Sequence, residues 1–179
     1  MAFPDVRADC ARYFTSEYAS GEMSQSLREA AAPILREFAV DALREVREAI
    51  AQQLESCPFL PVSVARTLAL DVESVAVPFI RNSSVLTDED LVALVRVGGE
   101  IKQIAVAERI TVSEVVSGAL VDTENRNVVS ALLANANAAI AEQTLHDAIA
   151  LVGDDAYVQE LFARRAVLPP GIKERLFRP

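Results

Sequence analysis

Apolar and polar residues follow a pattern along this chain that returns five times. Each copy has an apolar first position, a mostly apolar pair four and five residues later, and a polar residue seven residues later. The first positions are Val46, Val75, Ile101, Val128 and Val158; the pairs are Ile50/Ala51, Phe79/Ile80, Ala105/Val106, Leu132/Leu133 and Phe162/Ala163; the polar residues are Gln53, Asn82, Glu108, Asn135 and Arg165. These spacings predict one buried face of a helix. The copies start 26 to 30 residues apart, a period typical of an α-solenoid with two helices in each repeat.

A further apolar stretch precedes each copy and predicts a partner helix. The series from Leu27 to Phe38, for example, comes before the copy that starts at Val46. We therefore predict an all-α fold, a right-handed α-solenoid of about five helix pairs over residues 24–179. Residues 1–23 are predicted to add a helix that caps the first repeat. Its apolar residues at helical spacing are Val6, Cys10, Tyr13, Phe14 and Tyr18.

Residues that favour helix starts and turns recur with the same period. The predicted capping boxes, in which a hydroxyl and a carboxylate satisfy free backbone donors, are Ser26 with Glu29, Thr87 with Asp90, and Thr111 with Glu114. The last two boxes lie about one repeat apart. Gly98-Gly99 is predicted to form the turn between the two helices of its repeat.

The end of the chain predicts one helix without a partner. Pro169-Pro170-Gly171 precedes a short stretch with three apolar residues, Ile172, Leu176 and Phe177. A solenoid repeat normally buries such residues against a second helix. The stretch either closes the solenoid or belongs to a longer natural protein, and its apolar residues could also form a homodimer contact.

Several of these segments resemble a known family. They are Val40-Asp41 with Glu45-Val46-Arg47, Phe79 to Asn82, Leu86 to Leu94, and Leu132 to Asn135. Their pattern resembles HEAT-like repeats and is similar to the bacterial family called domain of unknown function 2336, over roughly residues 24–177. The resemblance implies a HEAT-like fold and carries no activity to individual residues. The chain departs from the pattern at Glu108 and Arg165, where the repeated asparagine is absent.

Composition and charge narrow the class of partner. The 179 residues have a net charge of −9, so nucleic acid and anionic membranes are unfavoured partners. The sequence has no apolar run long enough to span a bilayer, and MAFPDVRADC lacks the features of a signal peptide. Cys10 and Cys57 lie far apart and are expected to be reduced thiols. We therefore expect a cytoplasmic protein.

The residues that could carry chemistry are few. His146 is the one histidine, and Asp147 follows it, loosely as in the phospho-accepting segment of histidine kinases. The acidic residues at 88–90 and 154–155 lie at predicted helix starts, where capping explains them. The chain contains none of the Gly-rich phosphate loops, nucleophile elbows or zinc-binding helix motifs of common enzymes. We expect a protein that is not an enzyme and needs no metal or cofactor.

The solvent face of the second helix of each repeat is the predicted binding surface. In stacked helix pairs these helices line the concave side, and the positions just outside the buried face are mixed in polarity, which suits a protein partner. The predicted contact residues are Ser74, Val77, Arg81, Gln103, Ser130, Tyr157, Glu160 and Arg164. The function we expect is a non-catalytic scaffold or adaptor.

Two alternatives come from other classes of function. HEAT-like folds resemble those of some alkylation-repair DNA glycosylases, and a basic strip could be formed by Arg81, Lys102, Arg126, Arg164 and Arg165. The net charge and the scarcity of aromatic residues oppose that interpretation. The other alternative is a regulatory domain in phosphotransfer signalling that uses His146.

Overall fold

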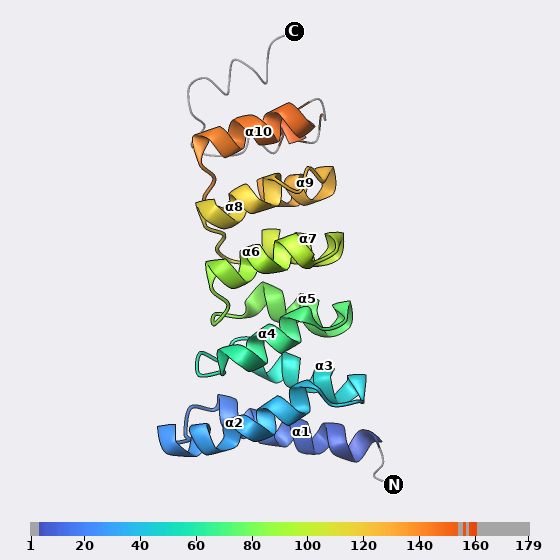
Figure 1. Cartoon of the computed structure of the whole chain (residues 1–179), viewed down its shortest axis with the longest axis vertical. Coiled ribbons are helices and arrows are strands. Elements are labelled where there is room, and N and C mark those ends of the chain that lie inside the picture. Colours follow the sequence, from blue (N-terminus) through green and yellow to red (C-terminus); the bar gives the residue numbers. More distant parts are fainter. Residues whose placement is uncertain (1–3, 154–155, 157, 161–179) are drawn as a thin grey trace. The chain divides into compact units, whose positions relative to one another are not determined.

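The computed structural model describes residues 4–153, 156 and 158–160 (Figure 1). Within these residues ten α-helices have defined bounds, residues 156 and 158–160 are also helical, and the β structure is limited to one isolated bridge. The helices are α1 (Pro4–Ala19), α2 (Gln25–Ala39), α3 (Arg44–Leu54), α4 (Val62–Leu70), α5 (Glu73–Asn82), α6 (Asp88–Val97), α7 (Glu100–Ala107), α8 (Glu114–Val121), α9 (Arg126–Ala134) and α10 (Glu142–Val152). The predicted all-α class is confirmed.

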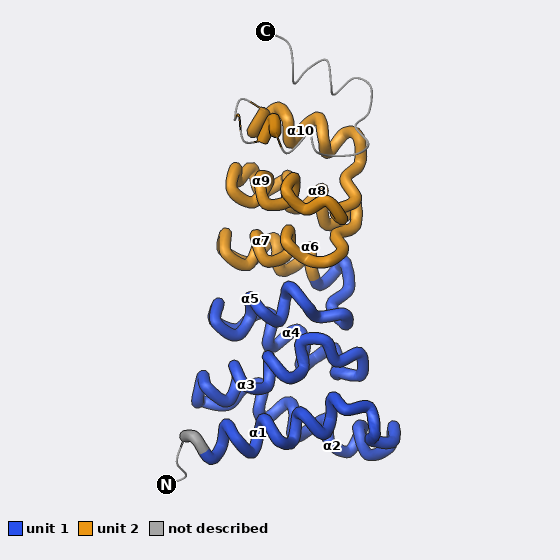
Figure 2. The backbone as a smooth tube through the Cα atoms, turned by 180° about the vertical axis from the view of Figure 1, so that it is seen from behind, with its two compact units in different colours: residues 1–90 blue, residues 91–179 orange. Residues whose placement is uncertain are grey.

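The chain forms two compact units, unit 1 over residues 1–90 and unit 2 over residues 91–179 (Figure 2). The division falls within α6, which contributes its first turn to unit 1. In the repeat pattern α2, α4, α6, α8 and α10 are the first helices. Their partners α3, α5, α7 and α9 are the second helices.

Unit 1 is built from two layers of helices. The second helices α3 and α5 pack in succession with α1 before them, and α2 packs against both α3 and α4. Fully buried large side chains such as Leu54, Leu68 and Phe79 fill the interior. Alanines at the helix contacts, among them Ala11 and Ala76, are also fully buried and allow the backbones to approach closely.

Helix α1 is present as predicted, but it buries a different face. The buried residues are Ala8, Ala11, Thr15 and Tyr18, whereas Val6 and Tyr13 are 54% and 72% exposed. Small residues face α3 because α1 packs closely along it within the layer of second helices. The predicted apolar face was therefore wrong for Val6, Cys10 and Tyr13, whereas Phe14 is half-buried and Tyr18 is buried.

Ion pairs connect successive elements of unit 1. Arg7 of α1 pairs with Asp41 before α3, and Arg47 of α3 pairs with Asp71 before α5. Arg47 donates from Nε to Asp71 Oδ2 at 2.5 Å and from Nη2 to Oδ1 at 3.0 Å, and the bond to Asp71 is the main cause of its raised pKa. Each arginine therefore fixes the turn that follows in the next repeat.

Asp90 at the start of α6 forms the predicted capping box. Its backbone N–H donates to Thr87 Oγ1 at 3.3 Å, and its carboxylate accepts from the Thr87 N–H at 3.1 Å. Arg66 of α4 adds a bond from Nε to Asp90 Oδ1 at 2.6 Å. Burial by itself would raise the pKa of Asp90, but the bonds from Thr87 and Arg66 lower it below its ordinary value of 3.8.

We expect Asp90 to contribute to acid sensitivity. A carboxylate with a lowered folded-state pKa stabilises the fold above its unfolded pKa, and this stability is lost as the pH falls through the folded value. Asp90→Asn should therefore make the free energy of unfolding fall less steeply on acidification below pH 3.8. Urea unfolding at a series of acidic pH values measures this slope. Equal slopes for the wild type and the variant would contradict the assignment.

Unit 2 repeats the two-layer arrangement and adds contacts between its loops. Helix α7 packs against α9, and α10 packs against α8 and α9. The loop before α8 pairs with the loop before α10, because the Ala139 N–H donates to the Val112 carbonyl at 2.9 Å. Ser117 Oγ, fully buried, donates to the carbonyl of Ala139 at 2.7 Å. These bonds align α8 with α10.

The repeated asparagine has a structural function in unit 2. Asn135, which follows α9, donates from Nδ2 to the carbonyls of Ala107 and Arg109 at 2.8 and 2.7 Å. Those carbonyls lie at the end of α7, so the side chain satisfies the free acceptors of the preceding repeat. In unit 1 the equivalent Asn82 donates from Nδ2 to a carbonyl of its own helix, that of Pro78, at 3.2 Å.

The repeat in α7 is shifted by one residue from the predicted frame. Val46, Val75 and Val128 are fully buried, but Ile101 is 49% exposed. Each buried valine is the third residue of its helix, and the third residue of α7 is Lys102. The predicted pair Ala105/Val106 is fully buried, and Ala107, which completes the pair of the shifted frame, is fully buried as well. In the shifted frame the polar position moves from Glu108 to the buried Arg109.

This shift gives an expected difference between two variants. Val128→Ala should lower the free energy of unfolding by about 2 kcal/mol, because a buried side chain is replaced by a cavity. Ile101→Ala should cost less than about 1 kcal/mol, although it removes more carbon atoms, because half of the side chain is in solvent. Urea unfolding followed by circular dichroism compares them. A larger loss for Ile101→Ala than for Val128→Ala would show that Ile101 is the buried first position, as in the unshifted frame.

Two of the predicted capping boxes are displaced. The N-cap of α2 is Ser24, whose Oγ accepts from the Leu27 N–H at 3.3 Å, and the N-cap of α8 is Ser113, which accepts from the Val116 N–H at 3.3 Å. Ser24 lies two residues before the predicted Ser26, and Ser113 lies two residues after the predicted Thr111. Hydroxyls stand at both places in each segment, so the motif alone could not distinguish them.

The predicted Gly98-Gly99 turn is present between α6 and α7. Its two glycines differ in the space that a side chain would have. A Cβ on Gly98 would lie 2.6 Å from the Leu94 carbonyl oxygen, whereas a Cβ on Gly99 would meet nothing within 4 Å. Gly98→Ala should therefore lower the unfolding free energy by about 1–3 kcal/mol, and Gly99→Ala by less than about 0.5 kcal/mol. Thermal unfolding of the two variants tests this, and equal losses would contradict it.

Candidate protein-binding surface

The predicted second-helix face is partly exposed in unit 1. Ser74 and Arg81 of α5 are exposed, and Val77 between them is half-buried. The equivalent residues of α3 include the exposed Glu45 and Gln52. The face offers polar side chains with little apolar area.

In unit 2 the predicted contact residues differ in exposure, and two of them lie outside the described residues. Ser130 of α9 is half-buried and Glu160 is exposed, while Tyr157 and Arg164 lie outside the described residues. Gln103 of α7 is half-buried, like Val77 and Ser130, and its side chain is directed toward α6. Its Nε2 donates to the Val95 carbonyl at 2.8 Å.

Glu100 at the start of α7 links the ends of two second helices. Its carboxylate accepts from Asn125 Nδ2 at 2.9 Å and from Asn127 Nδ2 at 2.8 Å. The bond from Asn125, followed by that from Asn127, lowers the pKa of Glu100. Asn125 is also the N-cap of α9, so this edge of the second-helix face is held together by its own polar groups.

Grooves recur at a different place, between the C-terminal ends of consecutive first helices. They lie between α2 and α4 in unit 1, and between α6 and α8 and between α8 and α10 in unit 2. Their volumes are about 450, 290 and 420 Å³. We call them turn grooves, because each is bordered by the turn that joins a first helix to its second helix.

The α2/α4 groove has an apolar rim and a charged floor. Val40 and Leu70, at the ends of α2 and α4, are 68% and 57% exposed. The ion pair of Arg47 with Asp71 lines the groove between them. Exposed apolar side chains supply area that a partner can desolvate, and a fixed ion pair can set the orientation of a charged partner.

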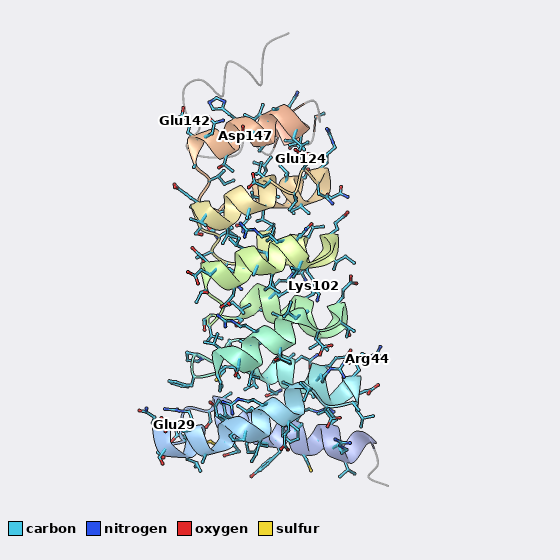
Figure 3. The ribbon with its side chains drawn as sticks, in the orientation of Figure 1. Glu29, Arg44, Lys102, Glu124, Glu142 and Asp147 are labelled. Atoms are coloured by element: carbon cyan, nitrogen blue, oxygen red, sulfur yellow. The ribbon has the colours of Figure 1, made fainter. Side chains whose placement is uncertain are left out.

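The two grooves of unit 2 are more polar. The α6/α8 groove contains Arg96, Gln103 and Asp122. Glu124 and Asp147 border the α8/α10 groove beside Leu151 (Figure 3). Asp122 reaches both grooves, so acidic character increases along the edge within unit 2.

Exposed aliphatic residues mark the same turns. Val72 and Val97, like Val40 and Leu70, stand where a first helix ends or a second helix begins, and so does Ile101. Sequence reasoning missed this surface because it considered only the solvent face of the second helices. The available signal was an additional aliphatic residue beside the turn in three successive repeats.

His146 and the two cysteines are among the residues that were considered for chemistry. His146 of α10 is 26% exposed, and its Nε2 lies 4.0 Å from Glu142 Oε1. Within the described part of the chain, His, Cys, Asp and Glu side chains nowhere gather in threes as a metal ion requires. Cys10 is exposed and Cys57 is buried, and both are free thiols.

The basic residues of the nucleic-acid alternative are dispersed. Arg81 belongs to unit 1 and Lys102 to unit 2. Arg126 donates from Nη1 to the Leu151 carbonyl at 2.5 Å, while Arg164 and Arg165 fall outside the described residues, as do Ile172, Leu176 and Phe177 of the expected dimer contact. No basic strip is shown within either unit as far as the structure describes it.

Comparison with known proteins gives one match. The model of a family described as "Uncharacterised protein conserved in bacteria (DUF2336)" matches residues 75–178, more than half of the chain. Three of the segments that carry the resemblance, from Phe79 onward, lie inside the match, and Val40 to Arg47 lie before it. Neither the curated proteins nor the solved structures gave a match. A search of the described helices for one long and apolar enough to cross a membrane found none.

Proposed function

We propose that this chain, which belongs to the DUF2336 family of uncharacterised bacterial proteins, is a non-catalytic helical-repeat scaffold that binds another protein. The recurrence of the turn grooves is the observation that carries the proposal, together with the exposed aliphatic residues at the α2/α4 groove and beside the turn between α6 and α7. A repeat protein binds extended partners by presenting equivalent sites at a fixed spacing. The proposal includes a continuous HEAT-like solenoid formed by the two units.

The α2/α4 groove is the best candidate for a binding hot spot. Val40 and Leu70 supply apolar area that a partner can cover, and Arg47 with Asp71 supplies polar groups that are already fixed. Preorganised side chains lower the entropy lost on binding. Removing the exposed aliphatic residues should therefore weaken partner binding more than it changes stability.

Two double variants separate this edge from the second-helix face. Val40→Glu/Leu70→Glu places charge on the groove rim, and Ser74→Glu/Arg81→Glu changes the second-helix face of the same unit. In affinity capture from the bacterium that encodes the chain, we expect a specific partner to be lost with the first variant and kept with the second. The reverse result would move the binding surface to the second helices. A partner kept by both variants would contradict both surfaces, and capture of no specific partner by the wild type would remove the scaffold proposal.

A further inference from the structure

A separate pocket lies at the other end of α2, away from the turn groove. Its volume is about 670 Å³, within the range of small-molecule sites. Its walls come from the end of α1, the first three turns of α2 and the loop before α4. The lining residues are Tyr18, Gln25, Arg28, Glu29, Ala32 and Arg36, with Phe59 and Pro61 opposite them.

Two arginines of α2 face this pocket. Arg28, Ala32 and Arg36 follow one another at intervals of four residues, so they share one face of the helix. Ala32 between them is buried and small, which leaves space between the two guanidinium groups. Among the residues that the structure describes, no carboxylate forms an ion pair with Arg28 or Arg36.

Arg28 is held in position by an aromatic ring. Its guanidinium carbon lies 4.0 Å from the centroid of the Phe59 ring, within the range of a cation–π interaction. Nη1 is shielded from solvent, so the group has a fixed place against the ring. Phe59 is itself fixed, because Tyr18 Oη donates to its carbonyl at 3.0 Å.

The remaining surroundings favour an anion with an apolar part. The pocket includes the first turn of α2, where the helix dipole is positive. Phe59 and Pro61 form an apolar wall, and Phe59 is 46% exposed. Glu29 is the opposing charge; it projects from the N-terminal half of α2 (Figure 3), and its Oε1 accepts from Gln25 Nε2 at 3.0 Å.

We propose that this pocket binds a small organic phosphate, with Arg28 and Arg36 on the phosphate group and Phe59 and Pro61 against the organic part. A phosphate monoester carries nearly two negative charges and three acceptor oxygens, and arginine matches it with paired donors. A carboxylate carries one negative charge and would balance the charge of one of the two guanidinium groups. The site is independent of the turn grooves and of the scaffold function.

Calorimetric titration of the full chain tests the assignment with four probes: adenosine monophosphate, inorganic phosphate, adenosine and an unphosphorylated acidic peptide. We expect the monophosphate to bind most tightly, phosphate more weakly and adenosine least. Arg28→Ala should weaken monophosphate binding about tenfold to a hundredfold, since charge-assisted bonds are lost. Arg12→Ala, on α1 outside the pocket, should change it less than about twofold. Glu29→Gln should strengthen it, because a repelling charge is removed.

Some outcomes would overturn the proposal. Equal binding of adenosine and its monophosphate would show that the apolar wall alone holds the ligand. Tighter binding of an unphosphorylated acidic peptide would assign the pocket to a protein partner, and absence of binding by every probe would remove the site. Arg28→Lys retains the charge without the paired donors, so full affinity in that variant would contradict the phosphate geometry. Thermal unfolding of each variant distinguishes lost binding from lost folding.

Discussion

Replacing Phe79 with alanine is expected to lower the free energy of unfolding of unit 1 by about 3–5 kcal/mol. Phe79 lies in α5 and is among the largest fully buried side chains of the chain. The substitution removes the ring and leaves a cavity in an interior whose alanines already bring the helices close together, so little collapse can compensate. Urea unfolding followed by far-ultraviolet circular dichroism measures the loss.

Phe59→Ala provides the matched control for this prediction. It removes the same atoms from the same unit, but Phe59 is nearly half exposed. Its loss should cost about 1 kcal/mol, mainly through the contact with Arg28. Similar losses for the two variants would show that α5 does not lie at the centre of the core.

Arg47→Ala is expected to lower the unfolding free energy of unit 1 by about 2–4 kcal/mol. The guanidinium bonds to Asp71 through two nitrogens, and its third nitrogen donates to the Asp41 carbonyl at 2.6 Å. The Arg47 and Asp71 side chains are only 17% and 11% exposed, so water cannot fully replace the lost bonds. The variant therefore removes bonds to two turns at once, the one at Asp41 before α3 and the one at Asp71 before α5.

Arg44→Ala is the control on the same helix. Arg44 pairs with Glu48 at 3.3 Å and is largely exposed, so its removal should cost less than about 0.5 kcal/mol. The double variant Arg47→Met/Asp71→Asn should lose less unfolding free energy than the sum of the losses of Arg47→Met and Asp71→Asn. Each single variant leaves the other partner without its bond, and the double variant removes both partners. Additive losses would show that the pair contributes no coupling between the two turns.

The main outline of the fold could be predicted because the repeat is a packing pattern. Buried valines at 46, 75 and 128, with the apolar pairs that follow them, produce helices wherever they occur in this period. The pattern failed at α7, where Ile101 looks like the buried residue although Lys102 occupies that position. The boundary of the helix decides the frame, and the sequence near Gly98-Gly99 does not fix it to one residue.

The face buried by α1 could not be predicted from hydrophobicity. Tyr13 and Val6 are the larger apolar residues, but the helix packs along α3 through Ala8 and Ala11. Close helix approach favours small side chains, so a helix with alanines on one face and larger apolar residues on another has two plausible orientations. The choice depends on a tertiary contact that local spacing does not encode.

The binding surface that we propose differs from the one that we expected from the sequence. The prediction relied on the concave side of an ideal solenoid, whereas the grooves depend on where individual turns leave Val40 or Leu70 in solvent. Ser74 and Arg81 were correctly expected to be exposed. Exposure alone does not make a binding surface, and the grooves required side-chain coordinates to be found.

Site-specific photo-crosslinking in the native bacterium tests the scaffold function most directly. A photoreactive phenylalanine analogue would replace Leu70 on the rim of the α2/α4 groove in one strain and Ser74 on the second-helix face in another. We expect one discrete crosslinked protein from position 70, competed by the unmodified chain, and none from position 74. A specific crosslink from position 74 with none from position 70 would contradict the proposed surface, and no specific crosslink from either would contradict the scaffold function.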